Sequence, residues 1–419
     1  MNRLFVLLVN RMKKAISISL FVLFFCSVHA QENLNFQIKA EYIYGNILKH
    51  TVHLQNLVKG PITGGEIAIE WQTSGEKRWN QYLNFPKVGI AATYIDLSSP
   101  DTLGRILAIY PYINIPIIRT KFINLYIKPG AGVSFLTKTF KDATAYFPSG
   151  EVNLNKSNAA IGSHFNVYFV GSVNVEIPLA AGFYLTGDYG WNHVSNGSII
   201  QPNSGINMLN GFVGLKYFPN YRSFQQPTKK ILSDITKDLT TEIILSGGIR
   251  QLYYKDNRFF PIGSITIAEF LPLTNYYRMG IGVDIFYDGV FGEVNSSSIA
   301  SENDTKYSRT RISSDLLQNK IRAGISWQHE LMIGRLSAGF HFGLYLYNPI
   351  KNLEPFQKAA TQTLNKPLIY DYDIEKEDGW LYTRASLKYA LDDHMFLSIG
   401  LKTHLQKAEF IEWGLGYRF

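Results

Sequence analysis

The sequence has a single cysteine, Cys26, and lacks both convincing helical periodicity and a basic run interleaved with aromatic residues. Cys26 lies in an apolar stretch that we expect to be removed, so the mature chain has no thiol, which excludes disulfides, cysteine nucleophiles and cysteine metal sites. About a third of the residues of an average globular protein are helical, so the missing periodicity argues against an ordinary soluble domain. The missing basic and aromatic run leaves no basis for nucleic-acid binding.

The N-terminus has the features of a cleavable export signal. Basic residues within 11–14 precede an apolar run over 16–26, and the small-residue site Val28-His29-Ala30 follows it. The run is too short to cross a bilayer as a helix. We therefore predict that residues 1–30 are a signal peptide, whose removal takes away four basic residues and lowers the net charge from +8 to +4.

Hydrophobic and polar residues alternate over stretches long enough to cross a membrane as strands. From Phe165 to Ile177 every second position is apolar or glycine, and Asn166, Asn174 and Glu176 lie between them. A membrane strand needs about 9–11 residues, which this segment exceeds. The final segment alternates in the same way and ends on Phe419, which resembles the C-terminal signature of outer-membrane proteins that is bound by their assembly machinery.

Segments of this kind predict an all-β fold, a transmembrane antiparallel β-barrel of about sixteen strands in the bacterial outer membrane. With the N-terminus in the periplasm, the long connections fall outside the cell and most short ones inside. The expected strands lie near residues 38–48, 64–73, 86–96, 105–117, 123–138, 163–178, 182–193, 206–218, 241–254, 260–271, 276–288, 319–330, 332–347, 379–390, 394–405 and 409–419.

The strands divide into two eight-stranded units, residues 31–218 and 241–419, joined by a polar linker at 219–240. The halves look duplicated, because the segment at 85–89 resembles the segment at 260–263. The strands can close as one wide barrel or as two tandem barrels. We favour one wide barrel, since two membrane barrels in one chain would be unusual.

A short polar motif stands at the end of the seventh expected strand, where His193 and Ser195 are two residues apart. Residues two apart on a strand point to the same face, and a serine becomes a good nucleophile only when a positioned imidazole removes its proton. His193 and Ser195 share the parity of the outward apolar residues, as does Asn207 on the next strand. All three are expected on the outer wall, where a lipid can reach them.

The motif, with the segment around it, resembles the lipid A 3-O-deacylase (PagL) and acyloxyacyl hydrolase family of outer-membrane β-barrels. The resemblance extends over residues 35–218 and implies an acyl-ester hydrolase that acts on lipid A of the lipopolysaccharide without a cofactor. It implies His193 as general base, Ser195 as nucleophile, and Asn196 with Gly197 at the oxyanion. The family's third catalytic residue is a glutamate, and Asn207 occupies its position; an asparagine can orient the histidine but cannot stabilise the imidazolium by charge.

Two alternatives remain at this level. The chain could be a non-enzymatic porin or transporter with a vestigial motif, in which inward cations such as Arg384, Lys388 and Lys402 tune a wide lumen. His193 and Ser195 would then be ordinary residues at a loop edge. We expect no metal site, because no third ligand accompanies His50 and His53, and no second active site, because His404 shares the lumenal parity of Lys402.

Overall fold

The computed structural model describes residues 35–233, 237–251, 254, 257–292, 315–348, 381–404 and 407–419. The predicted signal peptide at 1–30 lies outside the described residues, as do large parts of two predicted outer connections. Within the described ranges, no helix combines the length and the apolar character needed to cross a membrane.

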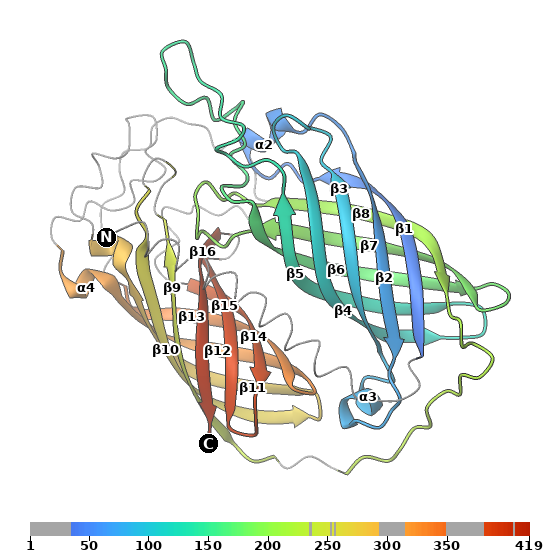
Figure 1. The fold of residues 1–419 in the computed structure, drawn as a ribbon. Helices are drawn as coiled ribbons and strands as arrows, with labels where there is room; N and C mark the ends of the chain where they lie inside the picture. Colours follow the sequence, from blue (N-terminus) through green and yellow to red (C-terminus); the bar gives the residue numbers. More distant parts are fainter. Residues whose placement is uncertain are drawn as a thin grey trace, which may run out of the picture.

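Sixteen antiparallel strands in the described residues close into two separate eight-stranded barrels (Figure 1). The first barrel consists of β1 (Phe36–Ile47), β2 (Ile62–Gln72), β3 (Lys87–Asp96), β4 (Arg105–Arg119), β5 (Asn124–Leu136), β6 (Phe165–Pro178), β7 (Phe183–Ser195) and β8 (Ile206–Tyr217). The second consists of β9 (Thr240–Arg250), β10 (Phe260–Thr274), β11 (Tyr277–Asp288), β12 (Ile321–Ile333), β13 (Leu336–Tyr347), β14 (Leu381–Ala390), β15 (Met395–His404) and β16 (Lys407–Arg418).

The pairing of the edge strands decides how the chain closes. β1 pairs with β8, and β9 pairs with β16, so each half is sealed by its own first and last strands. The prediction of sixteen strands in two eight-stranded halves is confirmed. The preference for one wide barrel is wrong, because the hydrogen-bonding edge of β8 is satisfied by β1 and no edge remains for β9.

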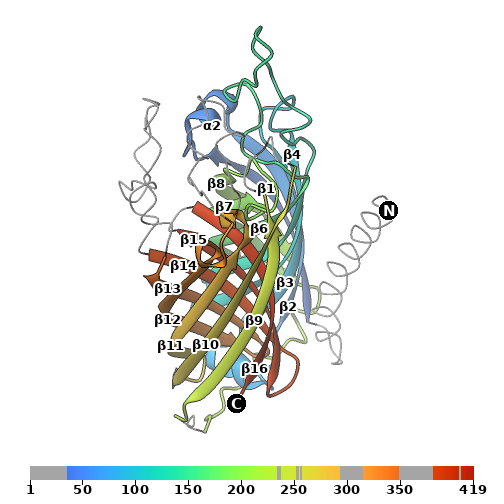
Figure 2. The same ribbon diagram turned by 90° about the vertical axis from the view of Figure 1, so that its left-hand side faces the viewer.

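Short helices occupy the connections at the two ends of the barrels. α2 (Val52–Leu57) lies between β1 and β2 at one end (Figures 1 and 2), and α3 (Arg78–Tyr82) lies between β2 and β3 at the opposite end (Figure 1). In the second barrel, η1 (Gly289–Gly292) and α4 (Leu317–Lys320) flank the connection from β11 to β12. We call the end with α2 and the β7–β8 connection the outer end, and the end with α3 and the linker from β8 to β9 the inner end.

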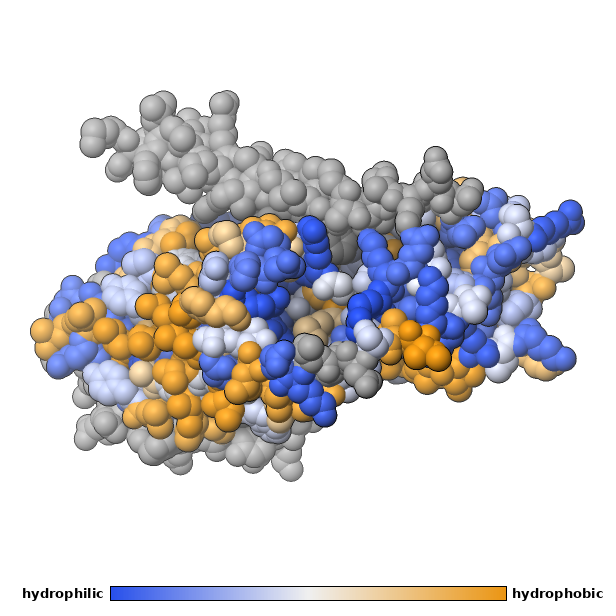
Figure 3. Space-filling model, turned by 90° about the horizontal axis from the view of Figure 1, so that it is seen from below, coloured by the Kyte–Doolittle hydropathy of each residue, from blue (hydrophilic) through white to orange (hydrophobic). Residues whose placement is uncertain are grey.

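The predicted alternation corresponds to the two faces of the barrel wall. In β6, Val173 is 43% exposed and its neighbour Asn174 is fully buried. Figure 3, which looks onto the inner end, shows hydrophobic residues along the flanks of both barrels. An apolar outer wall around a polar interior is the pattern of a membrane barrel.

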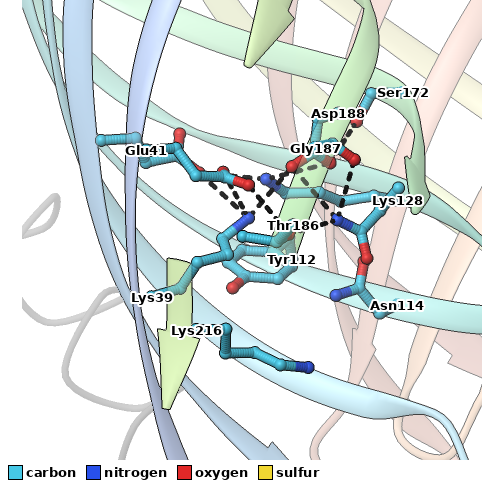
Figure 4. Close-up of polar contacts among 12 residues, drawn as sticks. Lys39, Glu41, Tyr112, Asn114, Lys128, Ser172, Thr186, Gly187, Asp188 and Lys216 are labelled. Atoms are coloured by element: carbon cyan, nitrogen blue, oxygen red, sulfur yellow. Dashed lines mark hydrogen bonds and ion pairs between the residues drawn. The ribbon is translucent and has the colours of Figure 1, made fainter. Parts of the chain in front are cut away.

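Paired charges fill the interior of the first barrel. Lys39 Nζ lies 2.7 Å from Glu41 Oε2 and 3.1 Å from Asp188 Oδ2 (Figure 4). Lys128 Nζ lies 3.0 Å from Glu66 Oε1, and all five side chains are buried. Buried ions are tolerated only when they are paired and hydrogen-bonded, and an eight-stranded barrel has room for side chains alone.

The second barrel is filled in the same way. Arg384 lies 3.0 Å from Asp284 and 2.9 Å from Glu412, and Lys388 lies 2.7 Å from Glu242. The predicted inward direction of these cations is therefore correct, but carboxylates neutralise them in a barrel too narrow for an aqueous channel. The porin alternative loses the wide lumen on which it depended.

The two segments that suggested a duplication are not equivalent in space. Residues 85–86 precede β3 at the inner end, whereas Phe260 begins β10 at the outer end. The halves share their strand number and direction, but the short sequence match between them joins different strands.

Candidate active site

The register of three neighbouring strands places the predicted site residues together at the outer end of the first barrel. His193 on β7 is directly opposite Asn207 on β8 and Phe169 on β6. Ser195 is the last residue of β7 and pairs with Val167. His193, Ser195 and Asn207, which were predicted to share the outward face, therefore lie close together.

These side chains form a hydrogen-bonded row. His193 Nε2 lies 2.9 Å from Ser195 Oγ, and His193 Nδ1 lies 2.7 Å from Asn207 Oδ1. Both distances are within hydrogen-bond range. The arrangement has a hydroxyl, an imidazole and an orienting group in the order that nucleophilic catalysis by serine requires.

Trp191 determines which atom of the Asn207 amide faces the histidine. The indole Nε1–H of Trp191 lies 3.2 Å from Asn207 Oδ1, and an indole nitrogen can only donate. The atom shared by Trp191 and His193 is therefore the acceptor oxygen, so His193 Nδ1 carries the proton. The neutral ring then presents an unprotonated Nε2 to Ser195, as a general base must.

Packing holds the imidazole in this orientation. The His193 ring stacks on Trp191, with centroids 5.4 Å apart and planes at 15°, and lies beside Phe169 at 6.3 Å. Gly205 closes the remaining side, since a Cβ there would lie 2.9 Å from His193 Cε1. Gly205 also has φ +74°, which a residue with a Cβ adopts only with strain.

The predicted oxyanion residues, Asn196 and Gly197, follow Ser195 in a tight turn. The Asn196 amide donates to Ser163 Oγ at 2.8 Å and to Ile200 O at 2.9 Å, and its backbone N–H donates to Asn203 Oδ1 at 3.1 Å. The N–H groups of Asn196 therefore bond to other residues of the protein and stabilise the turn. Gly197, with φ +59°, offers its backbone N–H alone.

Sequence reasoning missed His50, which it considered only as a metal ligand and set aside. His50 Nδ1 lies 3.4 Å from Asn207 Nδ2, and its Nε2 lies 3.0 Å from Ser204 O. The β1–β8 pairing carries His50 there, because Leu48 N donates to Asn207 O just beyond the last paired residues. Only the closure between the first and eighth strands could have revealed this. His53, by contrast, bonds Asn155 Oδ1 at 3.0 Å.

The outer wall beneath the site is apolar and open to lipid. Trp191 and Tyr189 continue the face of His193 along β7 and are 40% and 61% exposed, whereas Ser195 is 3% exposed.

His404 points into the second barrel, as predicted, with Nε2 2.9 Å from Glu409 Oε2.

Two family models match the chain, one in each barrel. The model of lipid A 3-O-deacylase (PagL) matches residues 63–216. The model of the acyloxyacyl hydrolase C-terminal domain matches residues 239–366 and 368–419. None of the curated proteins compared with the chain matches it.

Solved structures resemble the chain only weakly. The crystal structure of the outer-membrane enzyme PagL has 15% identity and a TM-score of 0.30, and the match covers 43% of this chain and 98% of that one. The alcaligin receptor FauA from Bordetella pertussis has 9% identity and a TM-score of 0.22, with 93% and 77% covered. The toluene transporter TodX from Pseudomonas putida has 7% identity and a TM-score of 0.17, with 92% and 88% covered. Similarity at this level carries no functional argument.

The family matches agree with the fold, since each falls on one of the two closed barrels. The chain is therefore an integral outer-membrane β-barrel protein of the PagL and acyloxyacyl hydrolase family, a family of outer-membrane acyl hydrolases.

Proposed function

We propose that this protein hydrolyses an ester-linked acyl chain of lipid A, or of a related glycolipid in the outer leaflet, with Ser195 as nucleophile. The row of hydrogen bonds from Ser195 through His193 to Asn207 carries the proposal. The family name supplies the substrate class, because its model describes a lipid A 3-O-deacylase.

In the first half of the reaction, His193 Nε2 removes the hydroxyl proton of Ser195 while Oγ attacks the ester carbonyl. The tetrahedral intermediate carries a negative oxygen, and the backbone N–H of Gly197 is our candidate donor to it. The C–O bond of the ester then breaks, and His193 returns the proton to the departing sugar oxygen. The products of this half are a free sugar hydroxyl and an acyl-serine.

In the second half, His193 removes a proton from water, which attacks the acyl-serine. Collapse of the second intermediate frees the fatty acid and returns the proton to Ser195 Oγ. Asn207 keeps His193 in the required tautomer in both halves but adds no negative charge. We therefore expect a slower reaction than a carboxylate in the same position would give.

The position of the candidate site on the outer wall of the first barrel suits a lipid substrate. An acyl chain in the outer leaflet can lie along the exposed side chains of Tyr189 and Trp191, on the same strand and face as His193. The polar sugar and phosphates then remain at the outer end, above the hydrocarbon region.

The test is release of fatty acid from purified lipid A by the full-length protein in detergent, measured by mass spectrometry. Ser195→Ala and His193→Ala should each abolish release, and the double variant should be no worse than either single one, because the two residues act as a unit. His53→Ala is the control, since His53 also lies at the outer end but bonds Asn155. Release by Ser195→Ala at the wild-type rate would contradict the proposal.

A further inference from the structure

The turn between β7 and β8, residues 196–205, lies between the two barrels at their outer end (Figure 1). Ser198 Oγ donates to Ala408 O at 3.0 Å, and Ser198 O accepts from the backbone N–H of Gln251 at 3.4 Å. Gln251 Oε1 in turn accepts from the backbone N–H of Gln201 at 2.9 Å. Three hydrogen bonds thus join the turn that follows Ser195 to the second barrel.

Apolar contact reinforces these bonds at Gly197. A Cβ on Gly197 would overlap the side chain of Ile411 on β16 and lie 3.3 Å from Leu401 Cδ1 on β15. The backbone at Gly197 therefore packs closely against the side chains of Ile411 and Leu401 in the second barrel. A larger residue at this contact would require the Ile411 side chain to shift or the barrels to move apart.

The backbone of the turn is in a conformation that needs outside support. Gly197 and Ser198 have φ values of +59° and +68°, and the left-handed region is strained for a serine. Such strain persists when the surroundings over-determine the conformation. At Ser198 those surroundings are Ala408 and Gln251, both of the second barrel.

The second barrel therefore contacts the turn at Gly197 and Ser198, two and three residues after Ser195. Ser198 is three residues after Ser195, and Gly197 carries the backbone N–H that we assign to the oxyanion. The first barrel holds Asn196 through Ser163. A shift of the turn would move the Gly197 N–H and Ser195 together, and misplacement by about 1 Å can cost about 100-fold in rate.

We propose that the outer end of the second barrel is part of the active site, with Gln251 and Ile411 as positioning residues. They act through the turn, which they hold so that Ser195 and the Gly197 N–H face the ester. This inference rests on the proposed function. It gives the C-terminal barrel a role in the reaction of the N-terminal one.

Contacts at the inner end provide a matched comparison. Arg78 on α3 donates to Asn275 Oδ1 at 2.9 Å, and the ring of Tyr82 lies 5.6 Å from that of Tyr276. These contacts also join the two barrels, but they lie at the opposite end from Ser195. Weakening them tests attachment of the barrels without changing the turn.

The experiment compares Gln251→Ala and Ile411→Ala with Arg78→Ala and Tyr82→Ala in the full-length protein. The first two should lower kcat for lipid A about 10- to 100-fold with little change in KM. They should also slow labelling of Ser195 by a fluorophosphonate, a reaction in which Oγ displaces fluoride from phosphorus. The second two should leave both rates near wild type, and heat-modifiable migration on gels shows which variants are folded.

A conservative change separates positioning from general packing. Gln251→Glu keeps an oxygen that can accept from the Gln201 N–H, so it should restore most of the rate that Gln251→Ala loses. Wild-type rates in folded Gln251→Ala and Ile411→Ala would overturn the inference, as would equal losses in the inner-end variants. Wild-type protein that neither reacts with the fluorophosphonate nor releases fatty acid would instead overturn the proposed function, and this inference with it.

Discussion

At the scale of single residues, Asn207 is the position at which the proposed site differs from the glutamate that the family resemblance implies. Its oxygen accepts from both His193 and Trp191, which fixes the useful tautomer of the histidine. An asparagine in this position usually fails because its amide nitrogen faces the histidine and selects the wrong tautomer of the ring. Trp191 prevents this, because its indole N–H donates to Asn207 Oδ1 and so keeps the oxygen turned toward His193. What remains absent is negative charge beside the imidazolium.

Asn207→Glu should therefore raise the rate of acyl release. A carboxylate between His193 and His50 would stabilise the imidazolium that forms when Ser195 loses its proton, and both rings can donate to it. The measurement is kcat on purified lipid A for wild type and variant.

His50→Leu in the Asn207→Glu background is the control for this prediction. Loss of the second imidazole should reduce the gain, because it removes one donor to the new carboxylate. Asn207→Glu with a rate equal to or below that of wild type would show that charge is not what limits the reaction.

At the scale of the elements, the strand pattern decided which residues meet lipid and which fill the barrel. Alternation alone predicted the faces of β6, and the exposure of Val173 beside buried Asn174 confirms them. The pattern did not show that the interior is full. Asn174 Nδ2 lies 3.3 Å from both Thr186 Oγ1 and Asp188 Oδ2, so its side chain is bonded to the side chains that fill the interior.

Val173→Arg should destabilise the first barrel by about 2–4 kcal/mol, because it places a charge on the lipid-facing wall of the membrane span. Leu179→Arg, in the exposed turn after the same strand, should cost about 0–1 kcal/mol. Reversible unfolding in urea from lipid vesicles measures both. Equal free energies of unfolding for the two variants would place Val173 outside the hydrocarbon region.

At the scale of the whole molecule, two closed barrels meet at their ends and are joined by one linker. The charges inside each barrel are paired within that barrel, as with Lys39 and Asp188 in the first and Lys388 and Glu242 in the second. Each barrel thus pairs these interior charges and the hydrogen-bonding edges of its first and last strands within itself. Among the residues that the structure describes, the contacts named above join the barrels at their outer and inner ends.

A protease site inserted between Gln225 and Gln226 tests this independence. Cleavage after folding should leave two fragments that each migrate as a compact, heat-modifiable band, because each barrel is closed by pairing of its own strands in the described residues. Gel migration before and after heating is the readout, and the uncut insertion variant is the control. Fragments that both lose heat-modifiable migration on cleavage would mean that the barrels cannot exist apart.

The sequence by itself determined the strands, their faces and the outward direction of His193, Ser195 and Asn207, because side chains alternate with a period of two whatever the closure. It also carried the family resemblance, since His193 and Ser195 are close in the chain. Recognition of Phe419 by the assembly machinery stays a prediction.

Only the tertiary structure decided that the chain forms two barrels, since the same alternation fits either closure and the choice depends on which edge strand reaches β8. The contacts of His50 with Asn207 and of Gln251 with the turn after Ser195 follow from that choice. They join residues far apart in the chain through strand pairing and barrel docking. No local pattern encodes them, because the first depends on the pairing of β1 with β8 and the second on how the two closed barrels pack against each other.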